Sequence, residues 1–513
     1  MSAHPSLDVF KKVVLAQPGK LVPVYRRFLS DSLTPVEAFR RLSQTPYAFL
    51  LESVERGERI GRWSFVGADP ELVISGDIVP TPKYTLEREG AEREAKSGDP
   101  IAALEGYLKE RPAAQLDGGD ELPPFSGGAV GYLGYDTVRG FETRLTKGQP
   151  AKRGFDKVPD VCVGLYKTVI AFDHVKNLIW IVHHADAREG GADAAHARAL
   201  NELSKVARRL TVPSTEPLSE LIVAQATAPA PTSNFAQPAQ FTQAVEAAKE
   251  FIAAGDIIQV VLSQRFTRVT NAPPFEVYRS LRAVNPSPYM FFLRMPDVNL
   301  VGSSPEVMVR LDGRQITVRP IAGTRKRGET PEEDARLAKE LLADEKERAE
   351  HIMLLDLGRN DVGRVSKLGS VRVTEQMMIE NYSHVMHIVS NVTGTLEDGL
   401  GAFDVFRACH PAGTVSGAPK IRAMEIIDQL EPDARGPYAG AVGVIGWNGA
   451  LNTCIAIRTI VMQPRVDGKF DAHVQAGAGL VADSVPQKEF EETQNKARAM
   501  LRALDAAEAR AGK

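Results

Sequence analysis

Residues 439–460, AGAVGVIGWNGALNTCIAIRTI, give the clearest indication of the fold, because two apolar runs flank a two-residue turn signal. Asn448 and Gly449 tolerate the positive φ angles that the tightest hairpin turns require. The flanking runs, 439–447 and 450–460, contain the small and β-branched residues that fit paired strands. We therefore predict an antiparallel hairpin here.

Sheet and helix patterns extend outward from this hairpin. Two further strand-like runs, 161–172 and 177–185, are separated by a charged turn, and 191–210 has the alanines and alternating charges of a helix. An amphipathic helix pattern begins near Phe241, and Gly255 follows it as a C-terminal stop. This mixture predicts an α/β (α+β) fold class with much antiparallel sheet.

A change in composition divides the chain. Residues 211–240 are rich in Pro, Thr, Ser, Ala and Gln, which is typical of linkers. We therefore predict an N-terminal region at 20–190 and a C-terminal domain at 241–505, joined by this linker.

Overall composition excludes several classes of protein. The 513 residues are 43% hydrophobic and 25% charged, with a net charge of -3 and no long basic run, so no nucleic acid is expected as a partner. There is no apolar run long enough for a membrane span and no signal peptide, so we expect a cytoplasmic protein without a membrane partner. The three cysteines are far apart, which indicates buried, reduced thiols.

Two pairs of glutamates have the spacing of one helix face. Glu347 and Glu350 are three residues apart, and so are Glu489 and Glu492. Together they would supply the oxygen ligands that Mg²⁺ prefers. Solvated helix faces are the simpler interpretation of the same spacing.

A glycine-rich stretch, VQAGAGLVADS at 474–484, matches G-x-G-x-x-A after a strand-like segment. A dinucleotide-binding turn is disfavoured, because too few residues follow Gly479 for the rest of that fold. A glycine loop whose backbone N–H groups approach an anion fits better, with a simple tight turn as the alternative.

Three single residues are further candidates, and each has a structural alternative. If 450–460 is one strand, Arg458 shares a face with Cys454 and Ala456, where it would hold a carboxylate or form a salt bridge. His387, in SHVMHIVS, would be a core histidine or a proton shuttle. Glu306 follows Ser-Ser-Pro in an apolar context, so it would be a general acid with a raised pKa or a surface turn residue.

Motifs along the chain together resemble the chorismate-utilising enzymes. In order they are PIAGTRKRGET (320–330), ERAEHIMLLDLGRNDVGRV (347–365), SHVMHIVSNVTG (383–394), HPAGTVSGAPKIRAMEIID (410–428), GPYAGAVG (436–443) and VQAGAGLVADSVPQKEFEET (474–493). LLESV (50–54) and GRWSFVGADP (61–70) resemble the regulatory region of the synthase component of anthranilate synthases.

The resemblance implies a fold and a set of ligands. The fold would be a large sandwich of two mostly antiparallel sheets flanked by helices. Mg²⁺ would be held by Glu350 and Glu492, with Glu347 and Glu489 in or near its coordination. Chorismate would be bound by groups spread over the C-terminal half, namely Gly323, Thr324, Tyr438, Arg458, Gly477, Ala478, Gly479 and Lys496.

The resemblance also implies a reaction, in which ammonia attacks chorismate and pyruvate leaves to give anthranilate. Glu306 would be the general acid and His387 would assist the later proton loss, with Gln259 and Thr324 beside them. Isochorismate and salicylate synthases carry a lysine where this chain has Gln259, and aminodeoxychorismate synthases carry one where it has Ala322. Both differences favour anthranilate synthesis, and these other reactions remain the alternatives, as does a binding protein that has lost its chemistry.

Two further properties are implied by the resemblance. A separate glutamine amidotransferase (glutaminase) subunit would supply ammonia, in a heterotetramer. L-Tryptophan would inhibit the enzyme by binding at the junction of the two regions, at Ser53, Pro288, Tyr289 and Met290.

Overall fold

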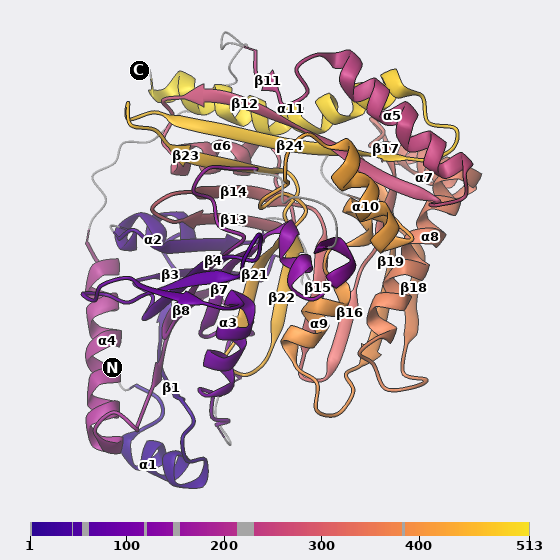
Figure 1. The fold of residues 1–513 in the computed structure, drawn as a ribbon. Helices are drawn as coiled ribbons and strands as arrows, with labels where there is room; N and C mark the ends of the chain where they lie inside the picture. Colours follow the sequence, from indigo (N-terminus) through magenta and orange to yellow (C-terminus); the bar gives the residue numbers. More distant parts are fainter. Residues whose placement is uncertain are drawn as a thin grey trace.

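The computed structural model describes residues 3–43, 45–53, 61–116, 121–146, 154–212, 230–381 and 385–511. They build two sheets of twelve strands each, with helices on the outer faces (Figure 1). Every ladder between the named strands of these ranges is antiparallel. The predicted sandwich of two mostly antiparallel sheets is confirmed.

The first sheet contains strands from both ends of the chain. Its order is β1 (Val22–Leu29), β10 (Leu178–Ala185), β9 (Thr168–Asp173), β3 (Trp63–Ala68), β2 (Ala48–Glu52), β13 (Tyr289–Arg294), β14 (Asn299–Ser304), β23 (Thr459–Pro464), β24 (Phe470–Leu480), β12 (Gln259–Thr270) and β11 (Thr232–Ser233), with β20 (Gly417–Ala418) beside β12.

The second sheet also contains strands from both the N-terminal and the C-terminal half of the chain. Its order is β17 (Ile321–Lys326), β19 (Val385–Thr395), β16 (Gln315–Val318), β15 (Val307–Asp312), β22 (Leu451–Ile455), β21 (Ala441–Gly446), β7 (Gly128–Leu133), β8 (Val161–Tyr166), β4 (Leu72–Asp77), β5 (Lys83–Glu87) and β6 (Glu94–Ser97), with β18 (Arg372–Asn381) beside β19. The predicted regions 20–190 and 241–505 therefore share both sheets.

Three hydrophobic layers hold this arrangement together. Phe49 and Phe291 of the first sheet pack against Tyr132 and Cys454 of the second in a core between the sheets. Residues of α1 (Leu7–Ala16), α2 (Pro35–Leu42), α4 (Gly191–Leu210), α6 (Pro274–Val284) and α11 (Pro486–Ala511) pack on the outer face of the first sheet. Residues of α3 (Pro100–Lys109), α8 (Glu345–Gly363), α9 (Ala402–Cys409) and α10 (Lys420–Leu430) pack with the second.

Several local predictions are confirmed. The hairpin β21–β22 pairs Ile445 with Leu451 around the Asn448-Gly449 turn, where Gly449 has a φ of 82°. The predicted helix at 191–210 is α4, and the one near Phe241 is α5 (Pro238–Ala253), with Gly255 at a φ of 81°. Most of the predicted linker lies outside the described residues, but β11 and the start of α5 fall inside its range.

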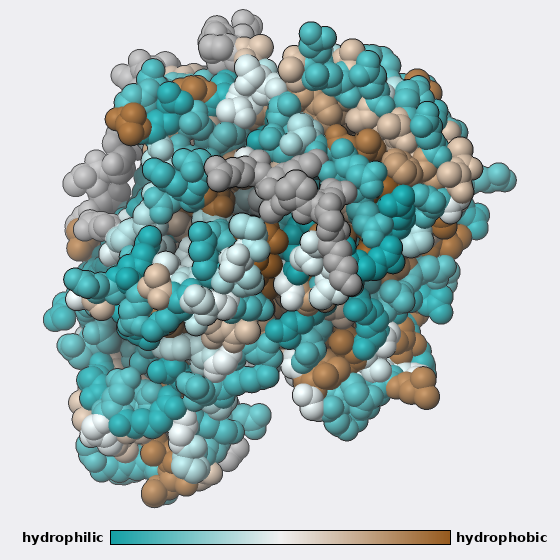
Figure 2. Space-filling view, viewed as in Figure 1, coloured by the Kyte–Doolittle hydropathy of each residue, from teal (hydrophilic) through white to brown (hydrophobic). Residues whose placement is uncertain are grey.

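The buried cysteines match the prediction. Within the described ranges, no helix is long and apolar enough to cross a membrane. Hydrophilic residues predominate on the face shown in Figure 2, where hydrophobic ones form scattered patches. Cys162, Cys409 and Cys454 are all buried and free.

Candidate active site

Two neighbouring crossovers between the sheets build the centre of the candidate site. The chain leaves the first sheet at the end of β14 and enters the second at β15, and Glu306 lies between these strands. It returns from β22 to β23 through residues 456–458. The two crossovers are hydrogen-bonded, because Ile455 N donates to Glu306 O at 3.1 Å and Ser303 N donates to Arg458 O at 3.1 Å. Residues 152 positions apart in sequence are thereby brought together.

The prediction that 450–460 is one strand is wrong. Strand β22 ends at Ile455, and β23 begins at Thr459 in the other sheet. Arg458 lies in the bend with a φ of 50°, a left-handed conformation that is uncommon for a side-chain-bearing residue. It therefore does not share a strand face with Cys454 and Ala456, because the change of sheet requires a turn in the backbone.

Glu306 has the environment of a neutral carboxylic acid. Its side chain is 5% exposed, and the Thr414 hydroxyl donates to its Oε1 at 2.7 Å. Burial raises the pKa of Glu306 to about 8, although Thr414, the backbone of Ile321 and the charge of Arg458 oppose the shift. The group is therefore mostly protonated at neutral pH and can donate a proton.

Arg458 is a cation with no direct ion pair among the described residues. Among the described residues its guanidinium forms no hydrogen bond or ion pair, although the group is largely buried. Burial lowers the pKa of Arg458, while Tyr438, Glu492 and Glu306 act in the opposite direction from nearby. A desolvated, unpaired guanidinium provides strong attraction for a carboxylate of a ligand.

The glycine-rich segment is a strand and not the predicted loop. Gly477, Ala478 and Gly479 lie within β24 because they continue its pairing with β12, opposite Ser263, Leu262 and Val261.

The amides of the two glycines point away from β12. In β12, Val261 N donates to Ser416 O and Ser263 N to Glu431 Oε1, so neither residue bonds to β24. The facing pairs are therefore non-hydrogen-bonded ones, and the N–H groups of Gly477 and Gly479 point to the opposite edge. Strand β23 pairs with β24 only as far as Val474, so these amides lie where its pairing has ended. The predicted role of approaching an anion fits this geometry.

Tyr438 and Lys496 lie against the same glycine. A Cβ atom on Gly477 would come within 2.9 Å of the Tyr438 hydroxyl, so only glycine leaves room between them. The Lys496 ammonium donates to Gly477 O at 2.9 Å and pairs with Glu492 at 2.6 Å, both side chains being on α11. The structure thus brings Arg458, Tyr438 and Lys496 to the open end of β24.

His387 is held in one tautomer by the strand opposite it. Its Nδ1 lies 3.0 Å from Gly323 O and 3.1 Å from Thr324 Oγ1, at a bulge in β17 where Gly323 has a φ of 71°. A carbonyl only accepts, so Nδ1 carries the proton and Nε2 the lone pair. Burial lowers the pKa of His387, which favours the neutral ring. The half-buried imidazole is therefore a possible base.

The candidate metal ligands come from α8 and α11. Gln259 Nε2 donates to Glu350 Oε1 at 3.3 Å, and Arg325 donates to Glu347 at 3.3 Å. Burial and the charge of Glu347 raise the pKa of Glu350, as does Glu492, whereas Gln259 and Lys496 lower it. Burial raises the pKa of Glu489 too.

These carboxylates do not form a closed metal cage. Among the described residues, no three His, Cys, Asp or Glu side chains are close enough to hold an ion by themselves. Mg²⁺ usually takes only one or two carboxylates, with water and substrate oxygens completing its octahedron. The crowding that disfavours the charge of Glu350 is what a cation would relieve, so the donor set fits Mg²⁺.

The candidate tryptophan residues also lie together. Strands β2 and β13 pair Glu52 with Met290, which places Ser53 and Tyr289 next in the register. Ser53 Oγ is buried without a hydrogen-bond partner among the described residues. Met290 belongs to the core with Phe292, so only its backbone can face a ligand, and Pro288 is buried. Tyr289 Oη lies 3.4 Å from Asn452 of β22, the strand that leads to Arg458.

Two residues around the site were not predicted from the sequence to be site residues. Thr414, beside Glu306, belongs to the short helix η3 (Gly413–Val415). Arg435 is fully buried, pairs with Glu431 at 2.6 Å and lies 5.6 Å from the ring centre of Tyr438. Thr414 lies within the quoted motif at 410–428 but was given no role there, and nothing in the local sequence distinguishes Arg435 from other arginines.

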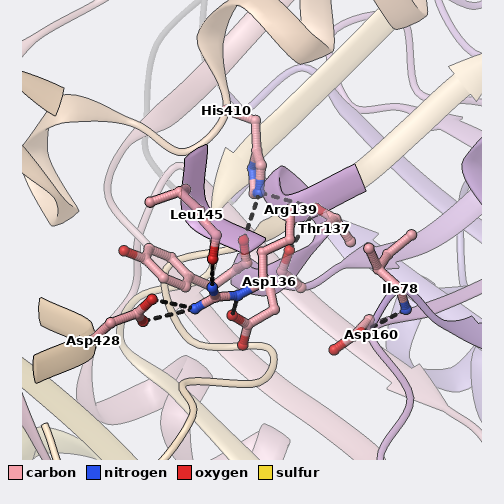
Figure 3. A network of polar contacts seen from close by, with 10 residues as sticks. Ile78, Asp136, Thr137, Arg139, Leu145, Asp160, His410 and Asp428 are labelled. Atoms are coloured by element: carbon pink, nitrogen blue, oxygen red, sulfur yellow. Dashed lines mark hydrogen bonds and ion pairs between the residues drawn. The ribbon is translucent and has the colours of Figure 1, made fainter. Parts of the chain in front are cut away.

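A polar network ties the N-terminal part of the chain to this region (Figure 3). Arg139, of the short helix η1 (Tyr135–Gly140), pairs with Asp136 at 2.7 Å and with Asp428 of α10 at 2.6 Å. His410 Nε2 lies 3.0 Å from the hydroxyl of Thr137. These contacts fix η1 against α10, close to the buried Arg435.

Comparison with known proteins assigns this arrangement to a class. The model of the chorismate binding enzymes matches residues 47–502. The chain therefore belongs to the family of chorismate binding enzymes, and the resemblance found in its motifs is confirmed, as is the prediction of an enzyme.

Individual relatives of the chain have more specific names than the family does. The chain is 47% identical over 506 residues to anthranilate synthase component 1 of Synechocystis, which covers 96% of this chain and 97% of that protein. It is 44% identical over 543 residues to the chloroplastic anthranilate synthase alpha subunit 2 of Arabidopsis thaliana, covering 99% and 86%. The crystal structure of anthranilate synthase component I from Streptococcus pneumoniae superposes with a TM-score of 0.73 at 36% identity, covering 93% and 99%.

Proposed function

We propose that this chain is the synthase component that converts chorismate and ammonia to anthranilate and pyruvate, the first step of tryptophan biosynthesis. One observation carries the proposal: adjacent crossovers bring the proton donor Glu306 beside Arg458, a cation that forms no direct ion pair among the described residues. A substrate with a carboxylate and a poor leaving group needs both. The names of the relatives support the same reaction.

The chemistry would proceed in two halves. Arg458, Tyr438 and the amides of Gly477 and Gly479 would hold the enolpyruvyl carboxylate. Glu306 would protonate the departing C4 hydroxyl, which leaves as water, while ammonia attacks C2 and the new amino group releases a proton. Neutral His387 would then accept the C2 proton as the enolpyruvyl group leaves and takes up a proton to become pyruvate. Protonation of so poor a leaving group contributes about 10²–10⁴-fold in enzymes.

The nucleophile is inferred from two side chains. Gln259 is a neutral amide that donates to Glu350, so it cannot take a proton from water. Ala322 is buried and offers no amine for a covalent adduct. Ammonia attacking directly is the remaining reaction, and isochorismate and aminodeoxychorismate synthesis are disfavoured.

Identification of the product tests the proposal. The purified chain is mixed with chorismate, Mg²⁺ and an ammonium salt at alkaline pH, and the products are separated and identified by mass. Anthranilate and pyruvate in equal amounts are expected. Aminodeoxychorismate or salicylate would select one of the alternatives, and complete absence of turnover would contradict the proposal.

Mg²⁺ is the proposed cofactor, held by Glu350 and Glu492 with Glu347 and Glu489 nearby. When bound, it would neutralise the ring carboxylate of chorismate and polarise it. We expect Glu350→Gln to lower turnover by about 10³-fold or more, since such Lewis-acid stabilisation is worth several kcal/mol. Calorimetry should show much weaker Mg²⁺ binding as well.

Glu345→Gln is the matched control, because Glu345 is an exposed glutamate of the same helix. It should bind Mg²⁺ and turn over chorismate like the unmodified chain. Full activity of Glu350→Gln would contradict the metal assignment.

We further propose a glutaminase subunit as the source of ammonia, in a heterotetramer, because the curated relatives are named as one component of a larger enzyme. Glutamine should support turnover only when such a subunit is added, whereas an ammonium salt should suffice without it. Turnover with glutamine by this chain alone would contradict the partner.

L-Tryptophan is the proposed inhibitor, bound between Ser53 and Tyr289. Ser53 Oγ would contact the charged amino or carboxylate group of the inhibitor, a hydrogen bond worth about 1.5–3 kcal/mol. Ser53→Ala should therefore raise the inhibition constant for tryptophan about 10- to 100-fold with little change in uninhibited rate. Ser97→Ala, on the exposed strand β6, should leave inhibition unchanged. Turnover that is insensitive to saturating tryptophan in the unmodified chain would contradict this site.

A further inference from the structure

A small, partly open hollow lies beside Glu306, between the second sheet and α8. It has about 30 Å³ of space that water can occupy, which is enough for one or two molecules. Most of its lining is apolar, including Leu354 and Leu357 of α8, but Glu306, Thr414 and Asp361 also line it. Three polar side chains from three different segments therefore face one small space.

One carboxylate oxygen of Asp361 has no hydrogen-bond partner of normal geometry among the described residues. The residue is 5% exposed, and its Oδ2 accepts from Lys420 Nζ at 2.8 Å. Its Oδ1 is buried and accepts no hydrogen bond of normal geometry among the described residues. A buried polar atom of this kind normally has a partner, and ordered water is the common one when room exists.

The ion pair between Asp361 and Lys420 joins α8 to α10 at 2.8 Å. Its two side chains, 7% and 11% exposed, are taken almost completely out of water. A buried pair is commonly no more stable than apolar side chains of similar volume would be. Burial raises the pKa of Asp361, and Lys420, Arg364 and Asn360 oppose that shift.

We propose that Asp361 and Lys420 are positioning residues. They hold water in this hollow, and a proton returns to Glu306 through that water after each turnover. The inference rests on the proposed function, in which Glu306 gives one proton to the C4 hydroxyl and that oxygen leaves as water. Glu306 is then a carboxylate, and one proton from solvent must reach it before the next cycle. With substrate or product filling the front of the site, the hollow offers a second route.

The test compares two variants with a control. Asp361→Asn removes the acceptor charge, and the double variant Asp361→Asn/Lys420→Met removes both charges and leaves no unpaired ion. We expect kcat to fall about 10- to 100-fold in both, less than for loss of the acid itself, with KM for chorismate unchanged. The solvent deuterium isotope effect on kcat should increase. Asp356→Asn, an exposed aspartate of the same helix paired with Arg359, should change nothing.

The stability of the double variant distinguishes a proton relay from a purely structural role of the ion pair. If the pair serves only the fold, the double variant should recover both the unfolding midpoint and kcat, and that outcome would overturn the proposal. A double variant that unfolds normally but stays slow supports it.

A spectroscopic measurement is independent of the reaction. The infrared C=O band of protonated Glu306, identified by its loss in Glu306→Gln, should shift in Asp361→Asn because both groups share the same water. An unshifted band would overturn the relay even if the product were not anthranilate. A shifted band with another product would instead reject only the proposed function.

Discussion

Glu306→Gln should lower kcat about 10²- to 10⁴-fold and leave KM for chorismate within a few-fold. Glutamine has nearly the same shape and can still accept from Thr414, so the pocket is retained. The variant lacks only the acidic proton, which is needed when the C–O bond of the leaving hydroxyl breaks. An interaction made only in the transition state changes kcat and not ground-state binding.

The assignment of Glu306 as the acid also predicts the direction in which the rate changes with pH. The pKa of Glu306 is raised to about 8, so its acid form is lost as pH rises through that value. Expressed per free ammonia, kcat/KM for chorismate reports the pKa of the free enzyme, so it should be constant near neutrality and fall above about pH 8. Glu306→Gln should lack this fall, since an amide does not titrate. A variant with the unmodified rate and profile would show that Glu306 is not the acid.

Stability should respond to pH in the matching direction. Because the folded-state pKa of Glu306 is raised, its favourable contribution is complete below the unfolded pKa of about 4.3 and is lost as pH rises to about 8. Glu306→Gln removes this dependence. Denaturant titrations at pH 6 and pH 9 should therefore show a smaller alkaline loss of stability in the variant than in the unmodified chain.

The parts of the fold that depend on local chemistry could be predicted from the sequence. The Asn448-Gly449 turn has its own requirement for positive φ, and α4 has a regular helical pattern, so both were identified correctly. The bend at 456–458 could not, because an apolar run looks the same whether it stays in one sheet or crosses to another. Tertiary pairing of β22 and β23 with different neighbours decides it.

The candidate site shows the same division. Its charged and glycine residues stand out by spacing and by motif, and the structure brings many of them together. Thr414, Asp361 and Lys420 lie within the quoted motifs, but their roles could not be predicted, because their positions around Glu306 depend on how α8, η3 and α10 pack. A predicted loop at Gly477–Gly479 proved to be a strand because small residues are equally suited to turns and to a strand approached closely by Tyr438.

Replacing Arg458 with glutamine should have opposite effects on function and on stability. Two charge-assisted hydrogen bonds to a carboxylate, each worth about 1.5–3 kcal/mol, would be lost, so kcat/KM for chorismate should fall about 10²- to 10⁴-fold. The unfolding free energy should rise, by about 1–3 kcal/mol, because the folded chain no longer buries a charge that has no direct ion pair among the described residues. Steady-state kinetics and urea titrations measure the two quantities.

Arg458→Lys separates the contribution of charge from that of geometry. Lysine keeps the positive charge, so the variant should gain no comparable stability, yet it cannot bind a carboxylate through two parallel bonds and should lose much of the affinity. Glutamine is preferred to asparagine for the neutral change, since asparagine tolerates the φ of 50° at this bend and would add a stabilising effect of its own. If Arg458→Gln were instead less stable than the unmodified chain, the guanidinium of Arg458 would have a structural partner. That result would contradict the proposal that its main role is to bind the substrate.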